Sequence, residues 1–160
     1  MDIRAGQLEL HLLTADDAER VLRRQPRAGE RWAIDYPSFE QLDYLRAYLV
    51  ELESAHPENF WQSQLRRRID GLVVGGAGVT GPPDEQGAVV IGYELAAEVS
   101  DSLHGTDIVL ALIEVARGMG ARRVTTNVFD DDQVRRHVYF AAGLSESRRD
   151  GRVVYLEREI

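Results

Sequence analysis

Two neighbouring segments leave this chain few ways to fold. Residues 88–95 (AVVIGYEL) have the length and β-branched content of a central strand. Residues 108–116 (IVLALIEVA) are apolar except for Glu114, and Gly118 and Gly120 follow as helix stop signals. A helix that is apolar on nearly every side must be buried, here against a sheet. The two segments therefore predict a layered α/β structure.

Strand and helix signals also alternate along the rest of the chain. Thr14 and Ser38 are typical helix N-caps, and the dipeptides Asp70-Gly71 and Asp150-Gly151 are strong hairpin signals. The predicted strands are residues 8–13, 59–69, 72–79, 88–95, 122–129, 144–149 and 152–160, and the predicted helices are residues 15–24, 39–52, 107–117 and 130–142. This order predicts an α/β fold with a mixed, mostly antiparallel sheet and helices on both faces.

Composition narrows the class of protein further. The 160 residues suit one domain, residues 1–160, because a core rarely divides at this length. A net charge of −8 argues against nucleic-acid binding, and no segment is long and apolar enough for a membrane span. The N-terminus lacks a secretory signal pattern, so we expect a cytoplasmic protein. The absence of cysteine excludes disulfides and thiolate chemistry, and the four histidines show no metal-ligand spacing.

Gly105 marks the point where the polar stretch VSDSLHG changes into the apolar helix. The N-terminus of a helix presents backbone N–H groups and a partial positive charge, which together hold a phosphate without basic side chains. A glycine at that point allows close approach of a ligand. The alternative interpretation is that Gly105 is only a turn residue and Thr106 only a cap.

Two motifs carry a resemblance to a known family. Residues 81–105, GPPDEQGAVVIGYELAAEVSDSLHG, resemble the GNAT superfamily of acyl-CoA N-acyltransferases, whose members often carry a G-P-P-D segment, an I-G-Y strand and a glycine-containing loop. The spacing of Asp132, Tyr139, Gly143 and Leu144 is similar to the family's N-x-x-(S/A)-x-x-x-Y-x-x-x-G-F helix. The resemblance covers nearly the whole chain and implies a GNAT fold whose central strands are splayed apart.

The resemblance also implies acetyl-CoA as cosubstrate. In the family the pantetheine arm lies between the splayed strands and pairs with backbone at the positions of Leu95, Ala96 and Ala97. The diphosphate lies on the loop that precedes the helix. The residues that match this loop are Ser102, Leu103, His104, Gly105, Thr106 and Asp107.

The sequence departs from the family at several of these positions. Ser102 stands where relatives carry Gln or Arg, Asp107 stands at a small-residue position, and Asp132 replaces the helix Asn. Two extra residues also separate Glu98 from Gly105. Arg135 and Arg136 are candidates to contact the cofactor phosphates instead; the alternative is that both belong to a solvated helix face.

The resemblance assigns Tyr139 as the general acid that protonates the departing thiolate, since the family's usual acid lies at this position. The alternative is that Tyr139 packs in the core. Many relatives carry a base glutamate where this chain has Val90. Glu94 lies four residues later on the same strand face and is our candidate for the base. Asp35 and Tyr36 are its rivals.

The resemblance implies that the loop before residue 39 forms part of the acceptor pocket, because this region often shapes that pocket in relatives. Trp32, Asp35 and Tyr36 are its candidate substrate-binding residues, although Trp32 can equally fill the core. No metal is expected.

The resemblance implies an N-acetyltransferase that transfers an acetyl group from acetyl-CoA directly to a primary amine in a ternary complex. The acceptor is a small-molecule or peptide amine. The alternative is a non-catalytic module of the same fold, which binds acyl-CoA or a protein partner. A homodimer is a further expectation, because the strand at residues 152–160 alternates apolar and charged residues as an edge strand does.

Overall fold

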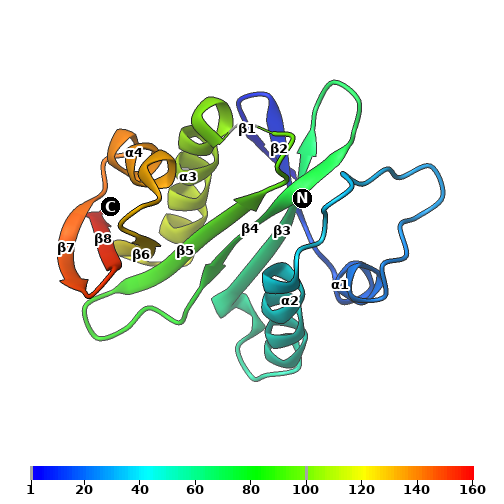
Figure 1. The fold of residues 1–160 in the computed structure, drawn as a ribbon. Coiled ribbons are helices and arrows are strands. Elements are labelled where there is room, and N and C mark those ends of the chain that lie inside the picture. Colours follow the sequence, from blue (N-terminus) through cyan, green and yellow to red (C-terminus); the bar gives the residue numbers. More distant parts are fainter. Residues whose placement is uncertain (1, 100) are drawn as a thin grey trace.

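The computed structural model describes residues 2–99 and 101–160. Its eight strands form one sheet in the order β1-β2-β3-β4-β5-β6-β8-β7 (Figure 1). The strands are β1 (Asp2–Ala5), β2 (Leu8–Leu12), β3 (Phe60–Arg67), β4 (Val73–Thr80), β5 (Ala88–Leu95), β6 (Arg123–Phe129), β7 (Ser145–Asp150) and β8 (Val153–Glu159). The helices are α1 (Ala15–Leu22), α2 (Phe39–Leu52), α3 (Asp101–Gly118) and α4 (Gln133–Ala141), with a short 3-10 turn at Pro57–Asn59.

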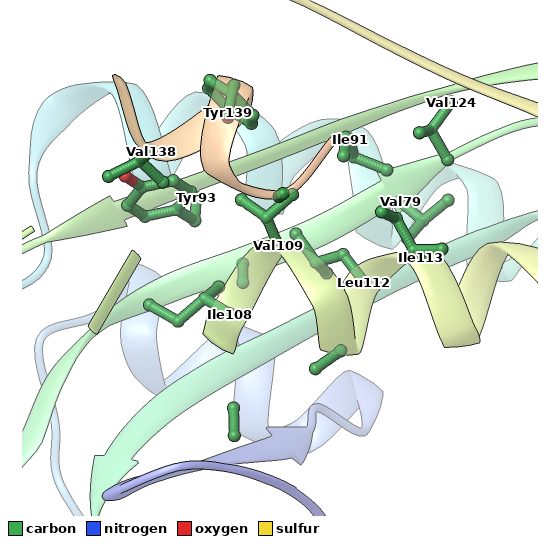
Figure 2. Close-up of a cluster of buried hydrophobic side chains, with 14 of the residues drawn as sticks. Val79, Ile91, Tyr93, Ile108, Val109, Leu112, Ile113, Val124, Val138 and Tyr139 are labelled. Carbon is green, nitrogen blue, oxygen red and sulfur yellow. The ribbon is translucent and has the colours of Figure 1, made fainter. Parts of the chain in front are cut away.

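The helices lie on both faces of the sheet, as predicted (Figure 1). α3 and α4 bury the larger hydrophobic core, which includes Ile91, Ile108 and Leu112 (Figure 2). α1 and α2 cover a second core around Leu42 and Tyr48 on the other face. None of the helices in the described part of the chain has the length and apolar character needed to span a bilayer.

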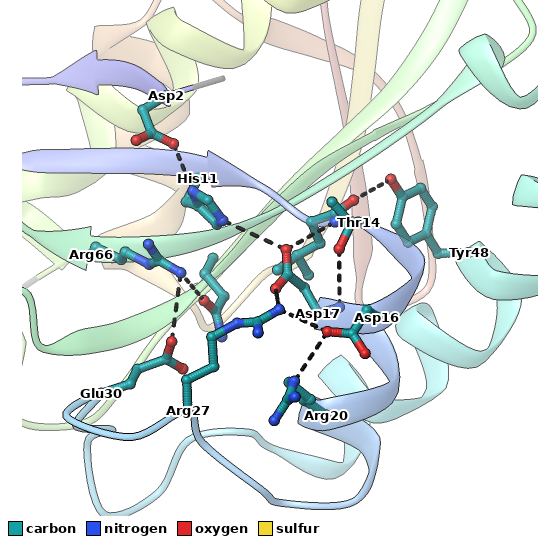
Figure 3. Close-up of polar contacts among 12 residues, drawn as sticks. Asp2, His11, Thr14, Asp16, Asp17, Arg20, Arg27, Glu30, Tyr48 and Arg66 are labelled. Atoms are coloured by element: carbon teal, nitrogen blue, oxygen red, sulfur yellow. Dashed lines mark hydrogen bonds and ion pairs between the residues drawn. The ribbon is translucent and has the colours of Figure 1, made fainter.

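Local capping fixes where α1 and α2 begin, which confirms both predictions. The side chains of Thr14 and Ser38 accept hydrogen bonds from the backbone N–H three residues on, and Asp17 and Gln41 bond back to complete two capping boxes. Asp17 also pairs with Arg27 from the following loop at 2.8 Å (Figure 3). α1 is thereby joined to the loop that leads toward α2.

The sequence analysis missed β1 and placed β8 wrongly. β1 pairs antiparallel with β2 around a turn at Gly6, which has φ +61°. β8 lies between β6 and β7, so the expectation that residues 152–160 form a sheet edge is wrong. The edge strand at this end of the sheet is β7, whose six residues are all exposed and mostly charged. Charged side chains at an edge discourage pairing with another chain.

α3 begins at Asp101 rather than near Gly105, and this corrects the predicted helix start. From the fifth residue of an α-helix onward, each N–H bonds to the carbonyl four residues back. The amides of Gly105, Thr106 and Asp107 are therefore used inside α3, so Gly105 is no turn residue and Thr106 no cap. The tip of the helix lies at residues 101–103 instead.

The two central strands separate after a short pairing. β5 and β6 are parallel and pair only over Ala88, Val89 and Val90. Beyond this point β5 continues to Leu95 and β6 to Phe129. We call the gap between the unpaired parts of these strands the β5–β6 opening. It confirms the splayed central strands implied by the resemblance.

Candidate active site

A cavity of about 150 Å³ lies between α2 and the sheet and extends through the β5–β6 opening toward α4. Gly76 and Gly78 from β4 and Gly92 from β5 line it. Residues two apart on a strand face the same side, so Gly76 and Gly78 present no side chain on one face beneath α2. The two glycines make room for the side chains of Gln41 and Gln62, which also line the cavity.

Acidic and aromatic side chains line the cavity on the side of α2. Glu40 and Tyr44 project from one face of this helix, and Glu94 projects from β5. Burial is the main cause that raises the pKa of Tyr44, and the charge of the neighbouring Glu40 carboxylate raises it further. This part of the cavity therefore presents two carboxylates and a phenol to whatever enters it.

Glu94 is half-buried, and burial is the main cause that raises the pKa of its carboxyl above the ordinary value. A hydrogen bond with Ser38 acts in the opposite direction, while the charges of Glu40 and Asp35 raise the pKa further and Arg135 lowers it. A carboxyl whose pKa is shifted toward neutrality is suited to accept a proton from an amine.

Tyr139 lines the opposite side of the cavity, from α4, as the resemblance implied. Its side chain is only 2% exposed, and burial raises the pKa of the phenol, against a hydrogen bond with Thr126 that lowers it. The phenol therefore stays protonated at neutral pH. The ring also packs in the core, tilted against Tyr93 with centroids 6.0 Å apart, as in the packing alternative weighed for Tyr139 (Figure 2).

A chain of hydrogen bonds orients Tyr36 at the cavity wall. Arg66 donates to Oε1 of Gln64 at 2.9 Å, and Nε2 of Gln64 donates to the Tyr36 hydroxyl at 3.2 Å. Burial raises the pKa of the Tyr36 phenol, against this hydrogen bond from Gln64, which lowers it. Glu30 lies 3.7 Å from the Arg66 guanidinium and completes the chain (Figure 3).

Arg135 reaches the cavity from α4 and lies among acidic and aromatic neighbours. Its Nε is 3.5 Å from Oδ2 of Asp101 and 3.9 Å from Oδ2 of Asp132, and its guanidinium lies 5.2 Å from the centroid of the Tyr93 ring. The Tyr93 hydroxyl donates to the same Asp101 oxygen at 3.4 Å. Asp101 is the first residue of α3.

The three predicted pantetheine-binding positions differ in the hydrogen bonding of their backbone groups. The N–H of Ala96 donates to the Val74 carbonyl at 2.7 Å, and the N–H of Ala97 donates to the Asp35 carboxylate at 2.9 Å. Both amides are thus occupied within the chain. Backbone groups alternate along a strand and those of Val89 face β6, so Leu95 alone of the three directs its backbone toward the β5–β6 opening.

The residues predicted to hold the diphosphate are spread over two turns of α3. Ser102 and Leu103 lie in its first turn, whereas His104 and Gly105 are buried. Asp107 faces the β1–β2 turn, where a Cβ added to Gly6 would lie 2.2 Å from its carboxylate.

Two further predicted phosphate ligands have structural partners. Asp132 caps α4 by accepting from the Arg135 N–H at 3.1 Å, and Arg136 donates to the Asp130 carbonyl at 3.0 Å. Of the two arginines, only Arg135 lines the cavity.

The candidate acceptor residues are only partly brought together. Tyr36 lines the cavity, but Trp32 and Asp35 do not. Trp32 packs edge-on against Tyr36 with centroids 5.3 Å apart, so it supports the wall from behind. Asp35 is joined to the Ala97 amide and acts on the cavity only through its charge on Glu94.

Sequence reasoning missed Glu40 and Tyr44. Their spacing of four residues places them on one helical face, and the alternating Gly76 and Gly78 mark the strand that this face covers. In the described residues, no group of histidine or acidic side chains is arranged to hold a metal ion.

Comparisons with known proteins agree with this geometry. A family model described as an acetyltransferase (GNAT) domain matches residues 7–145. No protein with a curated description matches the sequence closely enough to count as a relative.

Several solved structures share the fold at low sequence identity. A ribosomal-protein-S5-alanine acetyltransferase from Vibrio fischeri has a TM-score of 0.71 at 13% identity, with 99% of this chain and 96% of that chain covered. The microcin C7 self-immunity acetyltransferase MccE, solved with acetyl-CoA and AMP, has a TM-score of 0.66 at 11% identity, with 97% and 93% covered. A chimera of spermidine N-acetyltransferase SpeG from Vibrio cholerae and hSSAT has a TM-score of 0.65 at 12% identity, with 96% of each chain covered.

These structural likenesses establish the fold, and the family model extends over most of the chain, from the end of the β1–β2 turn to the start of β7. By this match and by its fold, the chain belongs to the GNAT family of acyl-CoA-dependent acetyltransferases.

Proposed function

We propose that this protein transfers an acetyl group from acetyl-CoA to a primary amine by direct attack in a ternary complex. The observation that carries the proposal is the shape of the cavity, which connects the α2 side of the sheet to α4 through the β5–β6 opening. A donor and an acceptor can therefore meet there from two sides. Glu94 and Tyr139, the two candidate proton carriers, line the same space.

The opening suits the arm of acetyl-CoA because it exposes one edge of a strand. The Val89 carbonyl faces β6, where it accepts from the Thr125 hydroxyl at 3.3 Å. Backbone groups alternate along a strand, so those of Ile91, Tyr93 and Leu95 face the same side, beyond the last residue that pairs with β6. An extended amide-containing ligand can pair with such an edge as an added strand.

The proposed chemistry needs one proton acceptor and one proton donor. As the amine nitrogen bonds to the thioester carbonyl carbon, Glu94 takes a proton from the nitrogen, directly or through a water molecule. When the carbon–sulfur bond breaks, the Tyr139 phenol gives its proton to the sulfur. The products are an acetylated amine and free CoA, and no covalent bond to the protein forms.

The amine acceptor is proposed to enter from the side of α2, where Glu40, Tyr44 and Tyr36 line the cavity. The named activities of the structural neighbours include acetylation of a ribosomal protein and of spermidine. We therefore propose a small-molecule or peptide amine as acceptor.

The experiment is to measure free thiol released from acetyl-CoA in the presence of amines of several classes. The panel contains diamines and polyamines, amino acids, aminoglycosides and short peptides with free N-termini. Thiol release that depends on an amine, together with a mass increase of one acetyl group on it, supports the proposal. Binding of acetyl-CoA without release for any amine favours the non-catalytic alternative. No binding and no release refutes both.

A further inference from the structure

The tip of α3 carries a carboxylate of the protein itself. Asp101 is the first residue of this helix, where the partial positive charge of the helix N-terminus is greatest. Its Oδ2 accepts from the Tyr93 hydroxyl at 3.4 Å and lies 3.5 Å from the Nε of Arg135. An anion is thus already present where a helix N-terminus would attract the phosphates of a ligand.

The ion pair with Asp101 also occupies Arg135, the arginine that lines the cavity. Arg135 is the only predicted phosphate ligand with a charged side chain directed at this space. It is 30% exposed and shared by Asp101 and Asp132, at 3.5 and 3.9 Å. A guanidinium that lies between two carboxylates is already neutralised by them. The phosphates of a ligand can therefore pair with Arg135 only by replacing one of these carboxylates.

We propose that Asp101 is an internal competitor for the diphosphate of acyl-CoA: its ion pair with Arg135 must open before the cofactor binds fully. This inference rests on the proposed function, because it assumes that acyl-CoA enters the β5–β6 opening. Asp101 then lowers the affinity for the cofactor, and Arg135 contacts the phosphates only after its ion pair with Asp101 has opened. Tyr93 holds the Asp101 carboxylate in place.

The carboxylate acts on the ligand in two ways. It repels the phosphates by like charge, and it withholds the guanidinium that would attract them. Both effects depend on the diphosphate and not on the thioester. A thioester without phosphates, S-acetylpantetheine, is therefore insensitive to this ion pair.

The test measures dissociation constants by calorimetry for acetyl-CoA and for S-acetylpantetheine. Asp101→Asn removes the charge and keeps the shape, and Glu114→Gln is the matched control, because Glu114 lies on the same helix but near its other end, where it pairs with Arg117. We expect Asp101→Asn to tighten acetyl-CoA binding about two- to fivefold, the range of one partly exposed charge interaction. Glu114→Gln should leave the affinity unchanged, and S-acetylpantetheine should bind all three proteins equally.

A second variant keeps the test decisive if Asp101→Asn folds poorly. Asp132→Asn leaves a good helix cap on α4 but removes the other carboxylate near Arg135, and we expect it to tighten acetyl-CoA binding by a smaller factor. Arg135→Gln should weaken acetyl-CoA binding and abolish the gain from Asp101→Asn in the double variant. Thermal unfolding without ligand checks that each variant is folded.

Several outcomes overturn the inference. Equal or weaker acetyl-CoA binding by Asp101→Asn would do so, as would an equal gain for S-acetylpantetheine. If acetyl transfer occurs while Asp101→Asn leaves affinity unchanged, the inference fails and the proposed function stands. If no variant binds acetyl-CoA, both fail.

Discussion

Gly105 and Tyr93 are in such close contact that a Cβ added to the glycine would lie 2.7 Å from the tyrosine hydroxyl oxygen. The same Cβ would lie 2.7 Å from a methyl carbon of Val138, on α4. Figure 2 shows Tyr93 and Val138 side by side in this part of the core. The glycine is therefore required for packing of α3 against β5 and α4, and this packing holds Tyr93 near Asp101.

Gly105→Ala should destabilise the protein by about 1–3 kcal/mol, the range for overfilling a packed core. The matched control is Gly118→Ala at the other end of α3, where an added Cβ meets nothing within 4 Å. That variant should be stabilised by up to ~1 kcal/mol, because alanine favours a helix over glycine. Urea unfolding at neutral pH measures both. Equal stability of the two variants would contradict the packing role.

Tyr139→Phe tests the proposed general acid. We expect thiol release from acetyl-CoA with a productive amine to fall by about a hundredfold, because general acid catalysis contributes about this much. Acetyl-CoA affinity should change little. The control is Tyr155→Phe on β8, where the ring packs beneath Arg148 away from the cavity. Unchanged release in Tyr139→Phe would reduce the role of this residue to core packing.

Glu94 should give the reaction a pH dependence of its own. A base must be deprotonated, so the rate at low amine concentration should rise with pH through the pKa of Glu94, which burial and neighbouring carboxylates place above the ordinary value. Glu40→Gln removes one of those carboxylates and should move this rise to lower pH. Glu94→Gln should abolish it and leave only the rise due to the amine itself.

Glu98→Gln is the control for the pH profile, because this glutamate follows the same strand but is exposed and outside the cavity. Its profile should match that of the unaltered protein. A rise that persists in Glu94→Gln at the same pH would assign the base to another group, and that group would not be the Tyr36 phenol, because burial raises its pKa above the ordinary value of a tyrosine.

Asp17 should make stability depend on pH in the acid range. Burial alone would raise the pKa of its carboxyl, but hydrogen bonds from Arg27 and Thr14 outweigh this and lower the pKa to about 2, from 3.8. The stabilisation is therefore complete above pH 3.8 and is lost as the pH falls toward 2. Asp17→Asn should cost ~1–2 kcal/mol at neutral pH, allowing for partial solvent screening, with a smaller cost below pH 3.

Asp16→Asn provides the comparison for Asp17, since Asp16 contacts the same Arg27 from a position that is 63% exposed (Figure 3). Asp16→Asn should lower the midpoint of urea unfolding less than Asp17→Asn does at every pH. If the difference in the free energy of unfolding between Asp17→Asn and the unaltered protein stays constant from pH 7 down to the acid range, the lowered pKa of Asp17 does not contribute to stability.

Most of the fold could be predicted because its signals are local. Thr14 and Ser38 cap their helices through residues three positions away, and the dipeptides at Asp70 and Asp150 close hairpins between adjacent strands. β1 could not be predicted, since its four residues depend on pairing with β2 and its turn at Gly6 carries no strong signal. The start of α3 was misplaced because glycine disfavours helices, while tertiary contacts with Tyr93 require it at position 105.

The candidate site was predicted less completely than the fold. Glu94 and Tyr139 line the cavity as expected, because strand alternation and the family motif place them. Glu40 and Tyr44 were missed, since nothing in the sequence states which strands α2 covers. The ion pair of Asp101 with Arg135 joins residues 34 positions apart, and only the folded chain brings them together.

A crystal structure of the protein with CoA bound would decide whether the β5–β6 opening holds the cofactor. We expect the pantetheine arm to lie in this opening, paired with the backbone of β5, with its sulfur within hydrogen-bonding distance of the Tyr139 hydroxyl. CoA bound elsewhere on the chain, with this opening empty or filled by the protein's own side chains, would contradict it.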